Sequence, residues 1–129
     1  MSGRFVLDTN IVIALFAGES TVQSHLKTAK EIFLPCIVLG EIYFGAYKSG
    51  GTRKNIEKIE KFACANFILA CDGETAKEYG IIKSALSARG LPIPENDIWI
   101  AAIAKQHKLI LVTRDAHFSN VDNLTVETW

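Results

Sequence analysis

The sequence has little cysteine and no long apolar run, and each shortage excludes a class of protein. Its three cysteines, Cys36, Cys64 and Cys71, are odd in number and form no C-x-x-C pair, so neither a disulfide framework nor a thiolate zinc site is expected. Buried, reduced thiols in a cytoplasmic protein are the simplest expectation. No stretch reaches the roughly 18 apolar residues of a membrane span, and the N-terminus lacks the pattern of a signal peptide. We therefore expect no membrane association.

The sequence also lacks an excess of either charge and the common catalytic motifs. Fourteen basic residues balance fourteen acidic ones, whereas a nucleic-acid binder is usually more basic overall, so support for that function must be local. The sequence contains no G-x-G-x-x-G, no P-loop and no G-x-S-x-G nucleophile elbow. His25, His107 and His117 lack the spacing of zinc ligands and are expected at the surface or in packing. His117 alone carries a reservation, because it lies two residues after Asp115.

The order of apolar segments predicts the fold class. With 129 residues and 49% hydrophobic content, the chain is expected to form one domain, 1–129, with a substantial core. Short β-prone runs predict strands at 4–7, 31–34, 66–69, 109–113 and 124–126. Apolar periodicity and stop signals predict helices at 11–17, 21–30, 36–48, 53–63, 73–89 and 97–105. This alternation predicts an α/β protein, a three-layer α/β/α sandwich around a parallel sheet of four to five strands.

Two carboxylates stand just past predicted parallel strands. Asp8 follows the first strand, and Asp115 follows the fourth through Thr113 and Arg114. Ligands of open parallel sheets bind at the carboxyl ends of the strands, so both residues are candidate metal ligands. Each also has a structural interpretation, because Asp8 can cap the next helix and Asp115 can belong to a turn.

Two further carboxylates interrupt apolar helices. Glu41 is the only charged residue between Cys36 and Tyr47, so its carboxylate needs a metal, a basic partner or partial exposure to offset desolvation. Asp97 opens a helix that is apolar on every face and therefore expected to be buried. An aspartate there is a good helix cap, yet the rigid approach through Pro92 and Pro94 also suggests a positioned site.

If the fold gathers Asp8, Glu41, Asp97 and Asp115, they form an oxygen-only pocket. Clustered carboxylates repel one another unless a cation is bound, and oxygen ligands favour Mg²⁺ or Mn²⁺ over zinc. Such ions can activate water for phosphodiester cleavage. Residues 48–61 carry a local excess of positive charge, which could contact phosphates or simply form a solvated helix face with Glu–Lys pairs.

Four segments together resemble the PIN-domain family, in particular the VapC-type toxins of toxin–antitoxin pairs. They span almost the whole chain and occur in the family's order: 5–10 (FVLDTN), 40–42 (GEI), 92–102 (PIPENDIWIAA) and 111–118 (LVTRDAHF). The resemblance implies a parallel α/β/α sandwich and a Mg²⁺- or Mn²⁺-dependent endoribonuclease that hydrolyses RNA with metal-activated water.

The resemblance also assigns roles and partners. Asp8 and Asp97 would hold metal directly, Glu41 and Asp115 directly or through water, and Thr113 would support the site, with Asn10 as a second supporting residue. The role of Asp115 is the least secure, since many relatives have asparagine near this position. The implied partners are an RNA substrate, a second copy of the chain in a homodimer, and a small cognate antitoxin in an apolar groove near the N-terminal helices.

Two alternatives to this interpretation remain. One is a non-catalytic RNA- or protein-binding module on the same fold, although retention of all four carboxylates speaks against it. The other is a phosphatase with an aspartyl nucleophile at Asp8, although Asn10 stands where such chemistry generally needs a second acid.

Overall fold

The fold is built on a five-stranded parallel sheet. A computed structural model describes residues 3–129. The strands β1 to β5 are Arg4–Leu7, Glu31–Pro35, Phe67–Leu69, Ile110–Val112 and Val126–Glu127. Their order across the sheet is β3-β2-β1-β4-β5, and every neighbouring pair is parallel. The central strand β1 is therefore flanked by β2 and β4, and its carboxyl end lies in the middle of one edge of the sheet.

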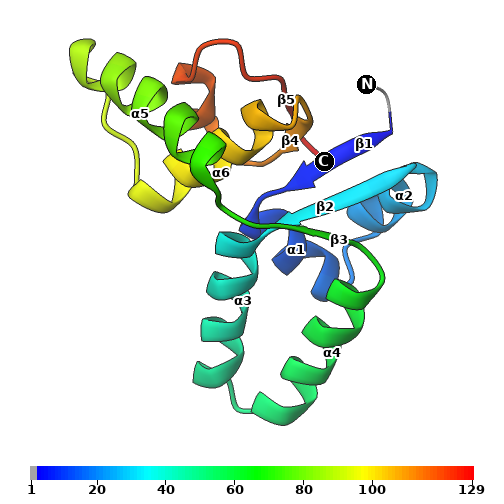
Figure 1. Cartoon of the computed structure of the whole chain (residues 1–129). Coiled ribbons are helices and arrows are strands. Elements are labelled where there is room, and N and C mark those ends of the chain that lie inside the picture. The colour runs from blue at the N-terminus through cyan, green and yellow to red at the C-terminus, as the bar shows by residue number, and fades with distance from the viewer. Residues whose placement is uncertain (1–2) are drawn as a thin grey trace.

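Helices cover the sheet on two sides. The helices α1 to α6 are Thr9–Phe16, Ser20–Thr28, Cys36–Lys48, Thr52–Cys64, Gly73–Ala88 and Glu95–Gln106, and a 3₁₀ helix, η1, covers Ala116–Asn120. Figure 1 shows α1, α3 and α4 below the sheet, with α3 and α4 forming a hairpin that extends away from it, and α5 and α6 above it. The predicted three-layer α/β/α sandwich with a parallel sheet is confirmed. Within residues 3–129, no helix combines the length and apolar character that crossing a bilayer requires.

The core joins the two central strands to α6. Val6 and Leu7 of β1 and Leu111 of β4 are fully buried, as expected for strands covered on both faces. Helix α6 is buried continuously from Ile100 to Ala104, which confirms the prediction drawn from its uniformly apolar sequence. A helix this enclosed holds its first turn in a fixed place relative to the sheet.

Two helices begin two residues earlier than predicted, and the cysteines are exposed rather than buried. Helix α1 begins at Thr9 because Asp8 already caps it, and α6 begins at Glu95 because Pro94 occupies its N-cap. The expectation of buried thiols is wrong, since all three cysteines are exposed. They lie at the ends of elements rather than in the core: Cys36 opens α3, Cys64 closes α4, and Cys71 precedes α5.

We predict that Leu111→Ala destabilises the protein by about 2–5 kcal/mol, because it removes a fully buried side chain between β1 and β5 and leaves a cavity. Denaturant unfolding measures the change. The matched control is Ile81→Ala on α5, where the side chain is 59% exposed and the expected change is within about 0.5 kcal/mol. Equal losses in the two variants would contradict the assignment of Leu111 to the core.

Candidate active site

Asp8 lies where β1 passes into α1, at the carboxyl end of the central strand. The parallel register aligns Leu7 with Val112, and the Asp8 N–H donates to the Val112 carbonyl at 3.0 Å. The carboxylate accepts the Thr9 N–H at 2.8 Å as the N-cap of α1 and the Thr113 hydroxyl at 2.7 Å. Asp8 is only 4% exposed. The cap and the candidate ligand are therefore the same group, and the two interpretations of Asp8 do not exclude each other.

The two residues expected to support the site both contact Asp8. Besides donating to Asp8, the buried Thr113 hydroxyl accepts the Asp115 N–H at 3.0 Å. The Asn10 amide nitrogen donates to Asp8 Oδ2 at 3.1 Å, and its oxygen accepts the Arg114 N–H at 3.2 Å. These bonds tie the loop after β4 to the start of α1 and fix the direction of the Asp8 carboxylate.

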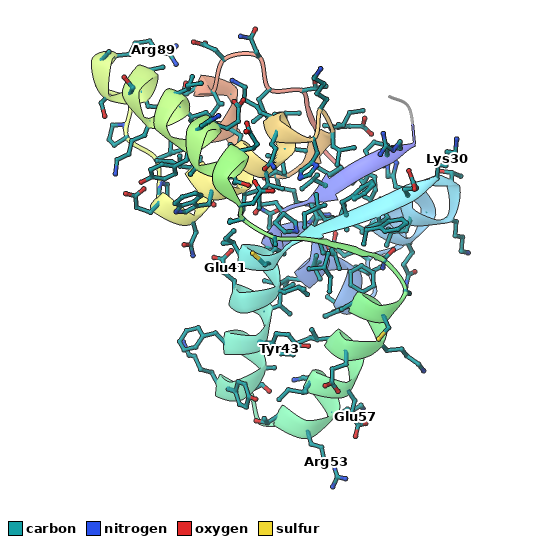
Figure 2. The ribbon with its side chains drawn as sticks, in the orientation of Figure 1. Lys30, Glu41, Tyr43, Arg53, Glu57 and Arg89 are labelled. Carbon is teal, nitrogen blue, oxygen red and sulfur yellow. The ribbon has the colours of Figure 1, made fainter. Side chains whose placement is uncertain are left out.

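Glu41 reaches this edge of the sheet from α3. Figure 2 shows it near the sheet end of the α3–α4 hairpin, whereas Arg53 and Glu57 lie at the opposite end. Its carboxylate is half-buried and accepts the Thr9 hydroxyl at 2.6 Å. Within the protein, the polar partner of the Glu41 carboxylate is thus a hydroxyl rather than a basic side chain. Thr9 joins Glu41 to the backbone that also carries Asp8.

Asp97 and Asp115 complete the set. Asp97 lies in the first turn of α6, but Pro94 is the N-cap, so the Asp97 side chain is free for a role other than capping. Its Oδ2 lies 2.7 Å from His117 Nε2. Asp115 is the N-cap of η1 and accepts the His117 N–H at 3.3 Å, while its Oδ1 lies 2.7 Å from His117 Nδ1.

Two residues of the site escaped the analysis of the sequence. His117, expected at the surface or in packing with one reservation, is partly exposed, and its two ring nitrogens contact the carboxylates of Asp97 and Asp115. The available signal was its position two residues after Asp115. Thr9 was not singled out from the sequence, and its bond to Glu41 spans 32 residues of sequence, which no local pattern reveals.

The carboxylates perturb one another. Burial raises the pKa of Asp8 above its ordinary value of 3.8, and the charges of Glu41 and Asp115 add to the rise, against hydrogen bonds from Thr113 and Thr9. Burial likewise raises the pKa of Asp97, with Asp8 and Asp115 adding to it and the His117 hydrogen bond opposing it. The structure thus brings all four predicted carboxylates together around Asp8, which interacts electrostatically with each of the other three.

This donor set fits a hard divalent cation. Four carboxylates from four different segments converge and repel one another, and Asp97, Asp115 and His117 offer ligand atoms within 4.8 Å of one another. That separation is about twice a metal–ligand bond of roughly 2.0–2.6 Å, so a single ion can reach all three. Carboxylate-rich sites of this kind suit hydrolysis assisted by a metal ion.

Comparison with known proteins agrees with this geometry. The profile of the family described as PIN domain matches residues 5–124. Ribonuclease VapC2 of Haemophilus influenzae strain Rd is 36% identical over 98% of both chains, and the tRNA(fMet)-specific endonuclease VapC of Shigella flexneri is 30% identical over 98% of both. The crystal structure of VapBC2 from Rickettsia felis, bound to a promoter DNA fragment, contains a chain that superposes with a TM-score of 0.91 at 28% identity, over 98% of both chains.

We predict that Glu41→Gln lowers the pKa of Asp8 part of the way toward 3.8, because it removes one repelling charge while the desolvation of Asp8 remains. The amide oxygen of glutamine can still accept the Thr9 hydroxyl. Carbon-detected NMR titration of the metal-free protein measures the pKa. Glu57→Gln, on the exposed end of α4, is the control and leaves it unchanged.

The same titration predicts the direction of the stability change. Because the folded pKa of Asp8 is raised, the folded state binds more protons than the unfolded state between the two pKa values, so stability falls as pH rises through that window. Glu41→Gln should make this fall smaller in denaturant unfolding of metal-free protein. An unaltered Asp8 titration in the variant would show that the two carboxylates do not interact.

Proposed function

The chain belongs to the PIN-domain family, and we propose that it is a divalent-metal-dependent endoribonuclease, the toxin of a toxin–antitoxin pair. The observation that carries the proposal is the convergence of Asp8, Glu41, Asp97 and Asp115 at the carboxyl edge of the sheet. The relatives named as ribonucleases support RNA as the substrate. Residues 1–129 would act as one domain, with the cytoplasm as the compartment where RNA is met.

We assign the cation to this carboxylate cluster. Asp8 and Asp97 would hold Mg²⁺ or Mn²⁺ directly, and Glu41 and Asp115 directly or through water. When bound, the ion supplies positive charge that favours attack of water on the phosphodiester and stabilises the leaving oxygen. Thr113, Asn10 and Thr9 orient the carboxylates before the ion arrives, since each donates a hydrogen bond to one of them.

RNA would reach this edge with help from the basic segment of α4. Lys54, Lys58 and Lys61 are exposed on this helix, beside Arg53, which pairs loosely with Glu57 at 3.7 Å. Exposed cations of this kind contact phosphates and position a strand without reading its sequence. Arg53 lies at the end of the hairpin far from Glu41, so its phosphate contacts would lie distant from the scissile bond (Figure 2).

An apolar groove supports an antitoxin partner. Helices α1, α3 and α4 enclose a groove of about 320 Å³, which extends from Glu41 past Gly45 and Ala46 to Lys58. Ile13 lines it and is 58% exposed, which is unusual for a large aliphatic side chain beside a core. We assign this groove to an apolar segment of the antitoxin, in keeping with the toxin–antitoxin complexes among the structural relatives. A homodimer of the chain is part of the same proposal.

We predict that Asp97→Asn lowers Mg²⁺- or Mn²⁺-dependent RNA cleavage by more than about 100-fold, the upper range for losing an outer partner of a metal ligand. Its melting temperature should not fall, because the variant removes a charge that burial disfavours. The matched control, Asp122→Asn, changes an exposed aspartate that pairs with Arg89 at 3.7 Å and retains full cleavage. Cleavage by Asp97→Asn at the wild-type rate would refute the assigned chemistry.

We predict that Gly45→Leu weakens binding of the antitoxin by more than about tenfold, or roughly 1.4 kcal/mol, because the new side chain fills the groove. A Cβ at Gly45 meets nothing within 4 Å, so the fold is retained and the helix gains about 0.5–1 kcal/mol. The partner for this assay would be the cognate antitoxin, and calorimetry measures its affinity.

Gly80→Leu provides the matched control for the groove. This glycine also lies within a helix, α5, with no atom within 4 Å of a Cβ, but on the other side of the sheet. Its affinity for the antitoxin should equal that of the wild type. Unchanged affinity in Gly45→Leu, or an equal loss in both variants, would place the antitoxin elsewhere.

A further inference from the structure

His117 stands between two of the proposed metal ligands. Its Nε2 lies 2.7 Å from Asp97 Oδ2 and its Nδ1 lies 2.7 Å from Asp115 Oδ1. We propose that His117 is itself a metal ligand, and that its imidazole nitrogen makes this centre select Mn²⁺ over Mg²⁺. This inference rests on the proposed function, because it concerns the same metal centre.

The 3₁₀ helix η1 holds the backbone of His117 in place. Asp115 caps η1 by accepting the His117 N–H, which fixes the turn that carries the ring. The next residue, Phe118, is fully buried and anchors this turn in the core, with its ring centroid 5.1 Å from that of His117. With this turn anchored, the imidazole is held with both ring nitrogens against carboxylates, so a nitrogen is already placed beside the proposed metal ligands.

The two ring nitrogens have different surroundings. Nδ1 contacts a residue of its own turn, Asp115, whereas Nε2 extends across to Asp97 on α6, whose pKa the charge of Asp8 helps to raise. In metal sites a ligating histidine usually donates its second N–H to a carboxylate, which fixes the ring and its tautomer. We accordingly assign Nε2 to the ion and Nδ1 to Asp115, which makes Asp115 an orienting residue rather than a direct ligand.

A nitrogen ligand changes which ion is preferred. Mg²⁺ is bound by oxygen and gives up its water reluctantly, so an imidazole adds little to its affinity. Along the divalent series, the affinity of mixed nitrogen and oxygen sites rises from Mn²⁺ onward, and imidazole favours transition metals. An otherwise carboxylate-lined centre that gains one imidazole should therefore strengthen Mn²⁺ binding more than Mg²⁺ binding.

The test uses metal-free full-length protein and the two metals alone. In His117→Gln, Mn²⁺ affinity measured by calorimetry should fall about tenfold, the lower end of the range for disturbed metal sites. Mg²⁺ affinity, measured by competition with Mn²⁺, should change by no more than about twofold, because oxygen ligands dominate its binding. His107→Gln is the matched control, since this exposed histidine follows the far end of α6, and neither affinity should change.

A spectroscopic measurement on the wild-type protein tests directly whether a nitrogen atom binds the Mn²⁺ ion. Pulsed electron paramagnetic resonance of the Mn²⁺ protein should show coupling to ¹⁴N, which His107→Gln keeps and His117→Gln loses. His117→Asn serves as a second variant if glutamine disturbs folding, which circular dichroism detects.

The outcomes separate the inference from the proposed function. Absence of ¹⁴N coupling in the wild type, or equal loss of Mn²⁺ and Mg²⁺ affinity in His117→Gln, overturns the role of His117 while the carboxylate centre stands. Failure of the wild type to bind either ion overturns the centre itself, and the proposed function with it.

Discussion

The alignment of β1 with β4 is the constraint on which the rest of this molecule depends. Because Leu7 pairs with Val112, the chain leaves both strands at the same level, and Asp8 and Thr113 come within hydrogen-bond distance. A slip of one residue would turn Asp8 to the other face of the strand and bury a charge without its hydroxyl partner. The register that fills the core with Val6 and Leu111 is thus the register that assembles the acidic cluster.

The carboxylates serve the backbone and the cluster together. Asp8 and Asp115 each satisfy a backbone N–H at the start of a helix, so both would be tolerated in the fold even without a ligand. Burial of Asp8 and Asp97 nonetheless costs stability, and repulsion among the carboxylates adds to that cost, as the raised pKa values of both residues indicate. A bound cation would offset the repulsion among the carboxylates and so stabilise the folded state.

Much of this arrangement could be predicted from sequence, and the failures share one cause. Strand–helix alternation predicts Asp8 and Asp115 at one sheet edge, and the uniformly apolar α6 predicts a buried helix that carries Asp97. Contacts between side chains from distant segments are different, because short motifs carry no distance information: Thr9 meets Glu41, and His117 meets Asp97, only after the sheet has formed. The exposed cysteines illustrate the converse, since residue type predicted burial whereas position at the ends of elements decided it.

Helix α3 belongs to two surfaces. Glu41 projects toward the carboxylate cluster and also lines the groove, and Gly45 follows it by about one turn. An occupant of the groove and an occupant of the cluster must therefore share a side chain, and their binding free energies cannot be independent. By thermodynamic reciprocity, any factor by which the partner weakens substrate binding is the factor by which substrate weakens the partner. Abundant substrate would thus favour release of the partner, so the degree of inhibition would depend on the RNA present as well as on the supply of partner.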